Sequence, residues 1–291
     1  MKPQTALGKK ETLRAVEQIR RMRGGAQSHL MRCSDGNYYV VKFQNNPQHK
    51  RVLVNELLGT RLARRLGLPT TPVAVVDVSE DLIRWTEELA MELPRNRVAC
   101  AAGRQFASRY PGDPRFVAAF DFLPDEQLRR VSNVHHFAGM LVFDKWTCNT
   151  NGRQTLFFRS RRAENRSVRD SAAAAGDEEP YATVMIDQGF CFNAGEWNFP
   201  DAPLRGLYAR NRVYEGVTGM ESFEPWLKNL EHASTDQALR EIVDELPPEW
   251  YDDDYDALMS LLEQLPKRRT RVPDLILEAK KSNRQPFPNW M

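Results

Sequence analysis

Residues 38–43, with the sequence YYVVKF, decide how this chain begins to fold. β-Branched and aromatic residues fit a pleated strand, so the stretch predicts a strand that ends near Lys42. The later stretch VLVNELL (52–58) has apolar residues at helical spacing and carries Glu56. A helical glutamate that orients a strand lysine is a recurring part of sites that bind nucleotide phosphates. We therefore expect Lys42 to contact phosphates and Glu56 to orient it.

The segments around this strand predict a small, β-rich N-terminal lobe. A turn with the sequence SDGN (34–37) joins an expected strand over 29–33 to the strand of Lys42, because Asp-Gly and Asn tolerate positive φ. An expected helix over 49–66 is followed by a Gly-Leu-Pro stop, and VAVVDV (73–78) predicts a further strand. We place this lobe within residues 1–115.

The remaining residues, 116–291, predict a mainly helical lobe. A helix over 133–143 is expected to lead to a polar cluster that begins at Asp144. Two expected strands flank residues 160–179, which are rich in Arg, Ser, Ala and acidic residues and predict a flexible insertion. From 217 to 280, apolar residues recur at helical spacing. The chain is thus predicted to be a two-lobed α+β protein.

A glycine-containing stretch, GGAQS (24–28), precedes the strand of Lys42. Gly24 and Gly25 would let backbone N–H groups approach anionic oxygens, and Ser28 would add a hydroxyl donor. The alternative is an ordinary turn. No GxxxxGK[ST] sequence occurs in the chain, so the stretch is not a Walker A loop.

Two polar clusters follow in the C-terminal half. Asp144 and Asn149 have the spacing of the aspartate and the metal-binding asparagine of a kinase catalytic loop, and Asn151 adds a second amide. Asp187 follows an apolar strand and precedes Gly189, which fits a metal-binding turn. The polar residues of each cluster could instead form a turn or cap a helix. Their order behind Lys42 and Glu56 favours Mg²⁺-dependent phosphoryl transfer.

The bulk composition indicates a globular protein of the cytoplasm. The hydrophobic content is 41%, the charged content is 27% and the net charge is +2, which gives no reason to expect nucleic acid as a partner. The four cysteines form no CxxC pair, which argues against zinc and fits a reducing compartment. The sequence has no long apolar run and no apolar stretch near its first residues, so neither a membrane span nor a signal peptide is expected.

Taken together, these motifs resemble the HipA-like kinases, a bacterial branch of the protein-kinase-like fold. The resemblance covers roughly residues 20–275 and is closest to a shorter, stand-alone subgroup. The stretches that carry it are NNPQ (45–48), NELL (55–58), LGLP (66–69), FDKW (143–146) with Asn149, and IDQG (186–189).

This resemblance implies ATP and Mg²⁺ as cofactors and phosphorylation of a Ser or Thr hydroxyl in a protein substrate. It also implies a possible antitoxin-like or regulatory protein partner. In its terms Lys42 holds phosphates, Glu56 orients Lys42 and Asp187 binds Mg²⁺.

The chain departs from the family at the catalytic loop. The family usually has aspartate in an Asn-x-Asp motif, where this chain has Asn151, and an amide cannot accept a substrate proton as a carboxylate does. The metal-binding asparagine expected five positions later is Leu156. Either Asp144 with Asn149 takes these roles, or Gln154 substitutes in part as a metal ligand.

Three alternatives follow from this departure and from the remaining segments. The first is a pseudokinase that binds nucleotide or a protein partner with little transfer. The second is a small-molecule kinase, whose pocket residues 196–216 would line. The third is a partner-binding protein that works through the arginines of residues 159–169, for which a solvated loop is the default interpretation.

Overall fold

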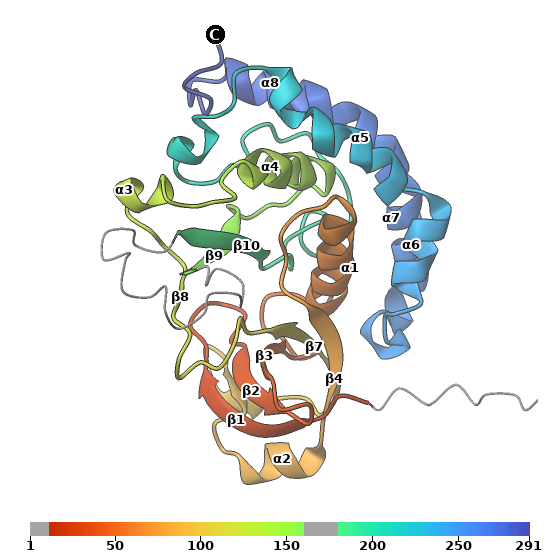
Figure 1. Ribbon diagram of the computed structural model, residues 1–291. Coiled ribbons are helices and arrows are strands. Elements are labelled where there is room, and N and C mark those ends of the chain that lie inside the picture. The colour runs from red at the N-terminus through yellow and green to blue at the C-terminus, as the bar shows by residue number, and fades with distance from the viewer. Residues whose placement is uncertain (1–11, 160–179) are drawn as a thin grey trace, which may run out of the picture. The chain divides into compact units, whose positions relative to one another are not determined.

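A computed structural model describes residues 12–159 and 180–291 of the chain (Figure 1). Contacts divide the chain into two compact units. The first comprises Met1–Pro47 and Val73–Tyr110, and the second comprises Gln48–Pro72 and Pro111–Met291. The helix that carries Glu56 thus groups with the C-terminal residues, whereas a single boundary near residue 115 was expected. The expected flexible insertion at 160–179 lies outside the described residues.

The first unit is built on an antiparallel five-stranded sheet with the order β1-β2-β3-β7-β4. Its strands are β1 (Ala15–Arg21), β2 (His29–Cys33), β3 (Tyr38–Lys42), β4 (Val73–Val78) and β7 (Gly103–Arg109). A parallel bridge between Arg14 and Asp77 joins the residue before β1 to β4, so the two ends of the strand order approach each other. Helix α2 (Glu80–Trp85) and the hairpin of β5 (Ala90–Glu92) and β6 (Arg97–Ala99) complete the unit.

The predicted hairpin between β2 and β3 is confirmed. Gly36 has a φ of 78°, which a residue with a Cβ rarely adopts. The Asp35 carboxylate accepts hydrogen bonds from the backbone N–H of Asn37 (3.0 Å) and the hydroxyl of Tyr39 (2.9 Å). These local bonds fix the register that turns alternate residues of β3 into the core. That core includes Met31, Tyr39, Val41, Phe43, Val76, Val78, Leu89 and Met91.

The second unit combines a small antiparallel sheet with helices. The sheet has the order β10-β9-β8 and consists of β8 (Ala119–Phe120), β9 (Gln154–Arg159) and β10 (Tyr181–Ile186). Its helices are α1 (Val52–Arg65), α3 (Asp125–Leu128), α4 (His136–Trp146), α5 (Glu224–Ala233), α6 (Asp236–Val243), α7 (Tyr255–Arg268) and α8 (Val272–Lys281). Short 3-10 helices lie at Asn211–Tyr214, Met220–Phe223, Pro248–Trp250, Asp252–Asp254 and Arg269–Arg271.

Helix α4 is the centre of the second unit's packing. It is apolar around most of its circumference, and all its residues except His136 are buried. It contacts α5 and α8 (Figure 1). A Cβ on Gly139 would lie 2.3 Å from the ring of Trp226, so glycine is what allows α5 to approach this closely. The indole N–H of Trp146 donates to the carbonyl of Leu265 at 2.9 Å and ties α4 to α7.

The two-lobed α+β prediction is confirmed at the level of fold class, and two local expectations differ from the structure. Helix α4 continues through Asp144 to Trp146 instead of ending before the polar cluster. Helix α2 and the β5–β6 hairpin were missed, because elements this short show too little periodicity to be recognised. Among the described residues, no helix has the length and apolar character needed to cross a bilayer.

The buried histidine of β2 makes the stability of the first unit depend on pH. His29 is fully buried, packs edge-on against Phe43, and lies with Nε2 3.9 Å from the sulfur of Cys100. Burial, with a smaller contribution from the charge of Arg21, lowers the pKa of His29 to about 4. Between about pH 6.5 and pH 4 the unfolded chain therefore binds a proton that the folded chain does not. Stability is retained above this window and falls as the pH drops through it.

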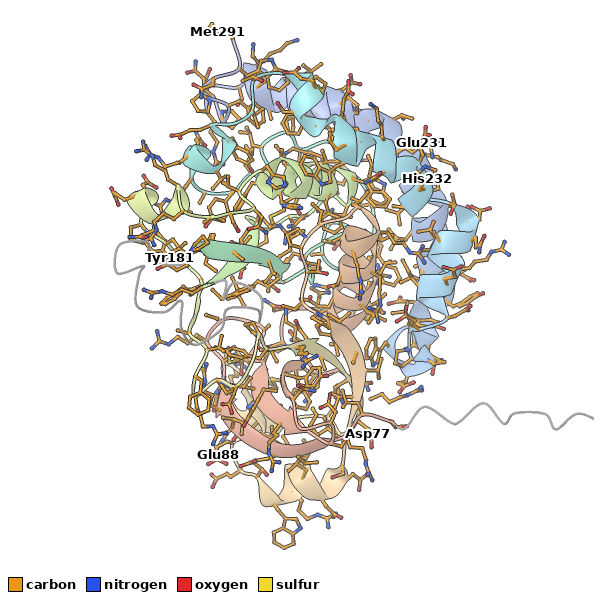
Figure 2. All side chains as sticks on the ribbon, in the orientation of Figure 1. Asp77, Glu88, Tyr181, Glu231, His232 and Met291 are labelled. Atoms are coloured by element: carbon orange, nitrogen blue, oxygen red, sulfur yellow. The ribbon has the colours of Figure 1, made fainter. Side chains whose placement is uncertain are left out.

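We predict that wild-type protein loses on the order of 2 kcal/mol more unfolding free energy between pH 6.5 and pH 4 than His29→Gln does. Urea denaturation at several pH values measures this difference. The control is His232→Gln, which changes an exposed histidine of α5 (Figure 2) and should keep the wild-type pH dependence. Equal pH dependence in wild type and His29→Gln would contradict the prediction.

Candidate functional site

The turn after β10 is the centre of the candidate site. Asp187 is half-buried and has a φ of 61°, in the left-handed region that aspartate adopts more readily than most residues. The Glu56 carboxylate, from α1, accepts hydrogen bonds from the backbone N–H groups of Gln188 (3.0 Å) and Gly189 (2.9 Å). A Cβ on Gly189 would lie 2.7 Å from a methyl carbon of Val52, so the turn can approach α1 only with glycine here. Helix α1 therefore fixes the backbone of Gln188 and Gly189, directly after Asp187.

Glu56 and Lys42 lie in different units. Glu56 is buried, and both of its oxygens accept backbone N–H groups within the second unit. Lys42 is buried at the end of β3, where it pairs in register with Phe106 of β7. The structure thus gives Glu56 a role in holding the Asp187 turn that the sequence did not indicate. The orientation of Lys42 by Glu56 stays a prediction.

Asp144 is engaged in an ion pair with Arg153 that is fully buried on both sides. The Arg153 Nε donates to one carboxylate oxygen at 2.9 Å, and its Nη2 donates to the other. Its Nη1 donates to the carbonyl of Ile186 (3.0 Å) and the side-chain oxygen of Gln188 (2.7 Å). Burial opposes the charge on Arg153, but the charge and hydrogen bonds of Asp144 outweigh burial and raise the pKa of the guanidinium. One arginine thus links α4 to the turn at Asp187.

Asn149 is also used internally. Its amide nitrogen donates to Asp144 at 2.9 Å, and its amide oxygen accepts the backbone N–H of Asn151 at 3.1 Å. Its exposed fraction is 1%. Both Asp144 and Asn149 are buried and hydrogen-bonded within this network. The geometry therefore favours structural roles for both residues over the catalytic and metal-binding roles that the sequence suggested.

Three polar side chains lie at or near the end of the β9–β10 pair where β10 ends and β9 begins. Asp187 directly follows β10, and Gln154 begins β9 opposite Ile186 and is exposed. Asn151 is half-buried, and its side-chain oxygen accepts the backbone N–H of Gly152 at 2.9 Å. Leu156 lies opposite Val184 and supplies no donor atom to this group.

These side chains suit a magnesium ion shared with a phosphate ligand. Among residues 12–159 and 180–291, no group of three or more His, Cys, Asp and Glu side chains could hold a metal ion. Mg²⁺ is commonly bound by one or two carboxylates together with substrate phosphates, not by a cage of protein ligands alone. Asp187 supplies such a carboxylate, and Gln154 and Asn151 supply amide oxygens. The donor set therefore fits the expected cofactor.

The predicted glycine loop is the connection between β1 and β2 in the first unit. Gly24 and Gly25 are exposed, and Gly24 has a φ of 112°. The Gln27 side chain accepts the backbone N–H of Glu92 (2.7 Å) and donates to the carbonyl of the same residue (2.7 Å), which anchors the loop to β5. Ser28 is buried. The exposed glycines, rather than Ser28, are the part of this loop open to a ligand.

Sequence reasoning missed Arg153 and Asn55, which organise this region. Arg153 was not singled out, since nothing in the local pattern shows that it is buried. Asn55 carried a usable signal, because it interrupts the apolar face of α1 and a buried amide requires hydrogen-bond partners. Both residues stabilise the segments that carry the candidate site residues.

Comparisons with known proteins agree with the expected kinase-like fold. A family model described as HipA-like kinase matches residues 15–161. The Golgi casein kinase structure has 13% sequence identity, covers 94% of this chain and 75% of that chain, and gives a TM-score of 0.50. The Helicobacter pylori proinflammatory kinase CtkA has 14% identity over 88% of this chain and 94% of that chain, with a TM-score of 0.50. Hydra Fam20 has 11% identity over 94% and 87%, with the same TM-score of 0.50. At these identities the structures show a shared fold. Comparison with curated proteins gave no match.

The buried ion pair predicts an asymmetric response to mutation. We expect Asp144→Ala to lower the free energy of unfolding by about 3–5 kcal/mol, because it leaves the Arg153 charge buried without its partner. The double variant Asp144→Leu/Arg153→Met should lose less, because it removes both charges together. Urea denaturation measures both values.

The control for this prediction is Glu224→Ala, which breaks an exposed ion pair with Lys228 on α5 and should cost no more than about 0.5 kcal/mol. A double variant less stable than Asp144→Ala would show that the charge left on Arg153 is not what destabilises the single variant.

Proposed function

Because the chain belongs to the HipA-like kinase family, we propose that it transfers the γ-phosphoryl group of ATP, with Mg²⁺, to a serine or threonine hydroxyl of a protein. The observation that carries the proposal is the turn at Asp187. Its carboxylate follows directly after β10, and the Glu56 carboxylate and the Arg153 guanidinium hold the residues on either side of it. Phosphoryl transfer depends mainly on positioning and on charge stabilisation, and a fixed carboxylate supplies both for a metal-bound phosphate.

Each unit contributes its own groups to this proposal. Lys42 acts as a cation for the α- and β-phosphates, and the backbone N–H groups of Gly24 and Gly25 donate to phosphate oxygens. Asp187 holds Mg²⁺, with Gln154 as an additional oxygen ligand. Bound Mg²⁺ would neutralise the phosphate charge. Asn151 hydrogen-bonds the acceptor hydroxyl but cannot take its proton, so we expect transfer to be slow.

A second candidate, a pseudokinase, is favoured by a specific observation. Both oxygens of Asp144 accept hydrogen bonds from Arg153, and both polar atoms of the Asn149 amide are used within the same network. With asparagine at position 151, the described part of the loop then offers no accessible carboxylate as a base. Such a protein would bind ATP and Mg²⁺ without turning the nucleotide over. A regulatory protein partner and a cytoplasmic location, expected from the sequence, stay predictions under either candidate.

The two ligand roles can be tested separately by nucleotide binding. We expect Asp187→Ala to weaken ATP binding about tenfold or more in the presence of Mg²⁺ and to leave metal-free binding nearly unchanged. Lys42→Ala should weaken binding with and without Mg²⁺, because it removes a charge that contacts the phosphates directly. Isothermal titration calorimetry measures these affinities.

The matched controls are Asp253→Ala and Lys228→Ala, which remove exposed charges of the same kind and should bind ATP as the wild type does. Wild-type protein that binds no ATP, with or without Mg²⁺, would refute the proposed function and the pseudokinase alternative together.

Turnover separates the two candidates. We predict that Asn151→Asp raises ATP turnover by about 10²–10⁴-fold, because it restores a carboxylate that can accept the hydroxyl proton. ADP release, with intact-mass detection of phosphorylated protein, measures the effect. Asn96→Asp, an exposed substitution in the β5–β6 turn, should leave turnover unchanged. ATP binding with no turnover in either wild type or Asn151→Asp would favour the pseudokinase.

A further inference from the structure

Asn55 makes an unusual set of contacts for a helical residue. It is fully buried in α1, one residue before Glu56. Its amide nitrogen donates to three backbone carbonyls, those of Gly189 (2.9 Å), Cys191 (3.0 Å) and Ala194 (2.8 Å). Its amide oxygen accepts the indole N–H of Trp197 at 2.7 Å. All four partners belong to residues 187–197, which we call the Asp187 loop.

The Asp187 loop needs such support because its backbone is strained. Residues with a Cβ are in the left-handed region at five of its positions, and this conformation is unfavourable for L-residues other than glycine. These positions are Asp187 (61°), Phe192 (59°), Asn193 (56°), Ala194 (56°) and Trp197 (51°). A backbone of this kind persists only where its surroundings fix it. Asn55 supplies that support at three carbonyls and one side chain.

Asn55 and Glu56 bind the same residue, Gly189, at its two backbone polar groups. Glu56 accepts the N–H of Gly189, and Asn55 donates to the carbonyl of that residue. The ring nitrogen Nε2 of His49 also lies 2.9 Å from this carbonyl oxygen. The residues that follow Asp187 are thus held at their donor and acceptor atoms together. A change at Asn55 removes its own bonds to the loop carbonyls and leaves the bonds of Glu56 and the contact of His49 in place.

Trp197 connects the far end of the loop to the same helix. Its indole N–H bonds to Asn55, and the Arg51 guanidinium lies 4.2 Å from the centre of its ring. Arg51 also donates to the carbonyl of Gly195 at 2.7 Å and pairs with Asp254 at the start of α7. The indole bond orients the Asn55 amide so that its nitrogen faces the three carbonyls. Loss of the indole donor therefore acts through Asn55.

We propose that Asn55 is a positioning residue for metal binding by Asp187: by fixing the carbonyls of the Asp187 loop, its amide sets the direction of the Asp187 carboxylate. This inference rests on the proposed function, in which Asp187 holds the metal ion. Residues that orient a metal ligand without contacting the metal themselves contribute about tenfold to a hundredfold in metal affinity. Asn55 contacts neither the metal nor the nucleotide in this scheme.

Metal affinity, measured apart from stability, tests this role. The probe is Mn²⁺, titrated by electron paramagnetic resonance into protein saturated with a non-hydrolysable ATP analogue. The variants are Asn55→Ser, which removes the amide, and Trp197→Phe, which removes only the indole donor and keeps an aromatic ring beside Arg51. Three further proteins complete the set: the double variant Asn55→Ser/Trp197→Phe, the variant Asp187→Ala and the wild type. Circular dichroism confirms that each variant is folded at the temperature of the titration.

The control is Trp226→Phe. It removes the same part of a buried indole from α5, where the ring packs against Gly139 and has no described contact with the Asp187 loop. It should lower stability to a similar extent and leave Mn²⁺ affinity at the wild-type value. This control separates a general loss of stability from a loss of metal positioning.

We expect Asn55→Ser to weaken Mn²⁺ binding by about tenfold to a hundredfold, and Trp197→Phe to weaken it by a smaller factor. The double variant should bind no more weakly than Asn55→Ser, because the two residues act through one hydrogen bond. Binding of the ATP analogue without metal should stay within about twofold of wild type in all of them.

Two results would overturn the inference, and they are distinguishable. Wild-type Mn²⁺ binding that Asp187→Ala does not weaken would refute the metal-binding role of Asp187 and, with it, the role of Asn55. Binding lost in Asp187→Ala but unchanged in Trp197→Phe and in folded Asn55→Ser would refute the role of Asn55 alone. If Asn55→Ser fails to fold, Trp197→Phe decides between these outcomes by itself.

Discussion

The buried guanidinium of Arg153 is the interaction on which the polar region of the second unit depends. A single planar group donates to Asp144 in α4, to the carbonyl that ends β10, and to Gln188 in the turn beyond it. A buried charge of this kind is tolerated only when its partners satisfy it, so all three segments must be in place together. The position of Asp187 between Ile186 and Gln188 follows from that requirement.

Helix α1 applies a second constraint to the same turn. Asn55 and Glu56 bind the Asp187 loop, while Arg61 and Arg65, on a later turn of the helix, pair with Glu245 and Glu241 beyond and within α6. Within the second unit, α1 is thus held at one end by the Asp187 loop and further along by α6 and the residues just after it. The turn at Asp187 and the helix that carries Glu56 therefore form one packed assembly in this chain. Lys42 belongs to the other unit.

Local patterns in the sequence predicted most of the fold. The strand at Tyr38–Lys42, the helix Val52–Arg65 and the strand Val73–Val78 were recognisable because periodicity and turn residues act over a few positions. The extension of α4 through Asp144 was not, since a polar residue normally marks the end of an apolar run. Here Arg153 compensates the buried carboxylate, and the helix continues.

For the candidate site, too, the sequence determined some properties and the tertiary structure decided others. The sequence by itself determined which residue types are present, in which order, and the resemblance that this order carries, because those properties need no partner. Only the tertiary structure decided which polar groups remain accessible. Glu56 and Gln188 are separated by 132 positions, yet they share a hydrogen bond, and the partners of Asn55 lie still further along the chain. Contacts at such separations arise from packing, and they assign Asp144 and Asn149 to the interior, whereas Asp187 is half-buried.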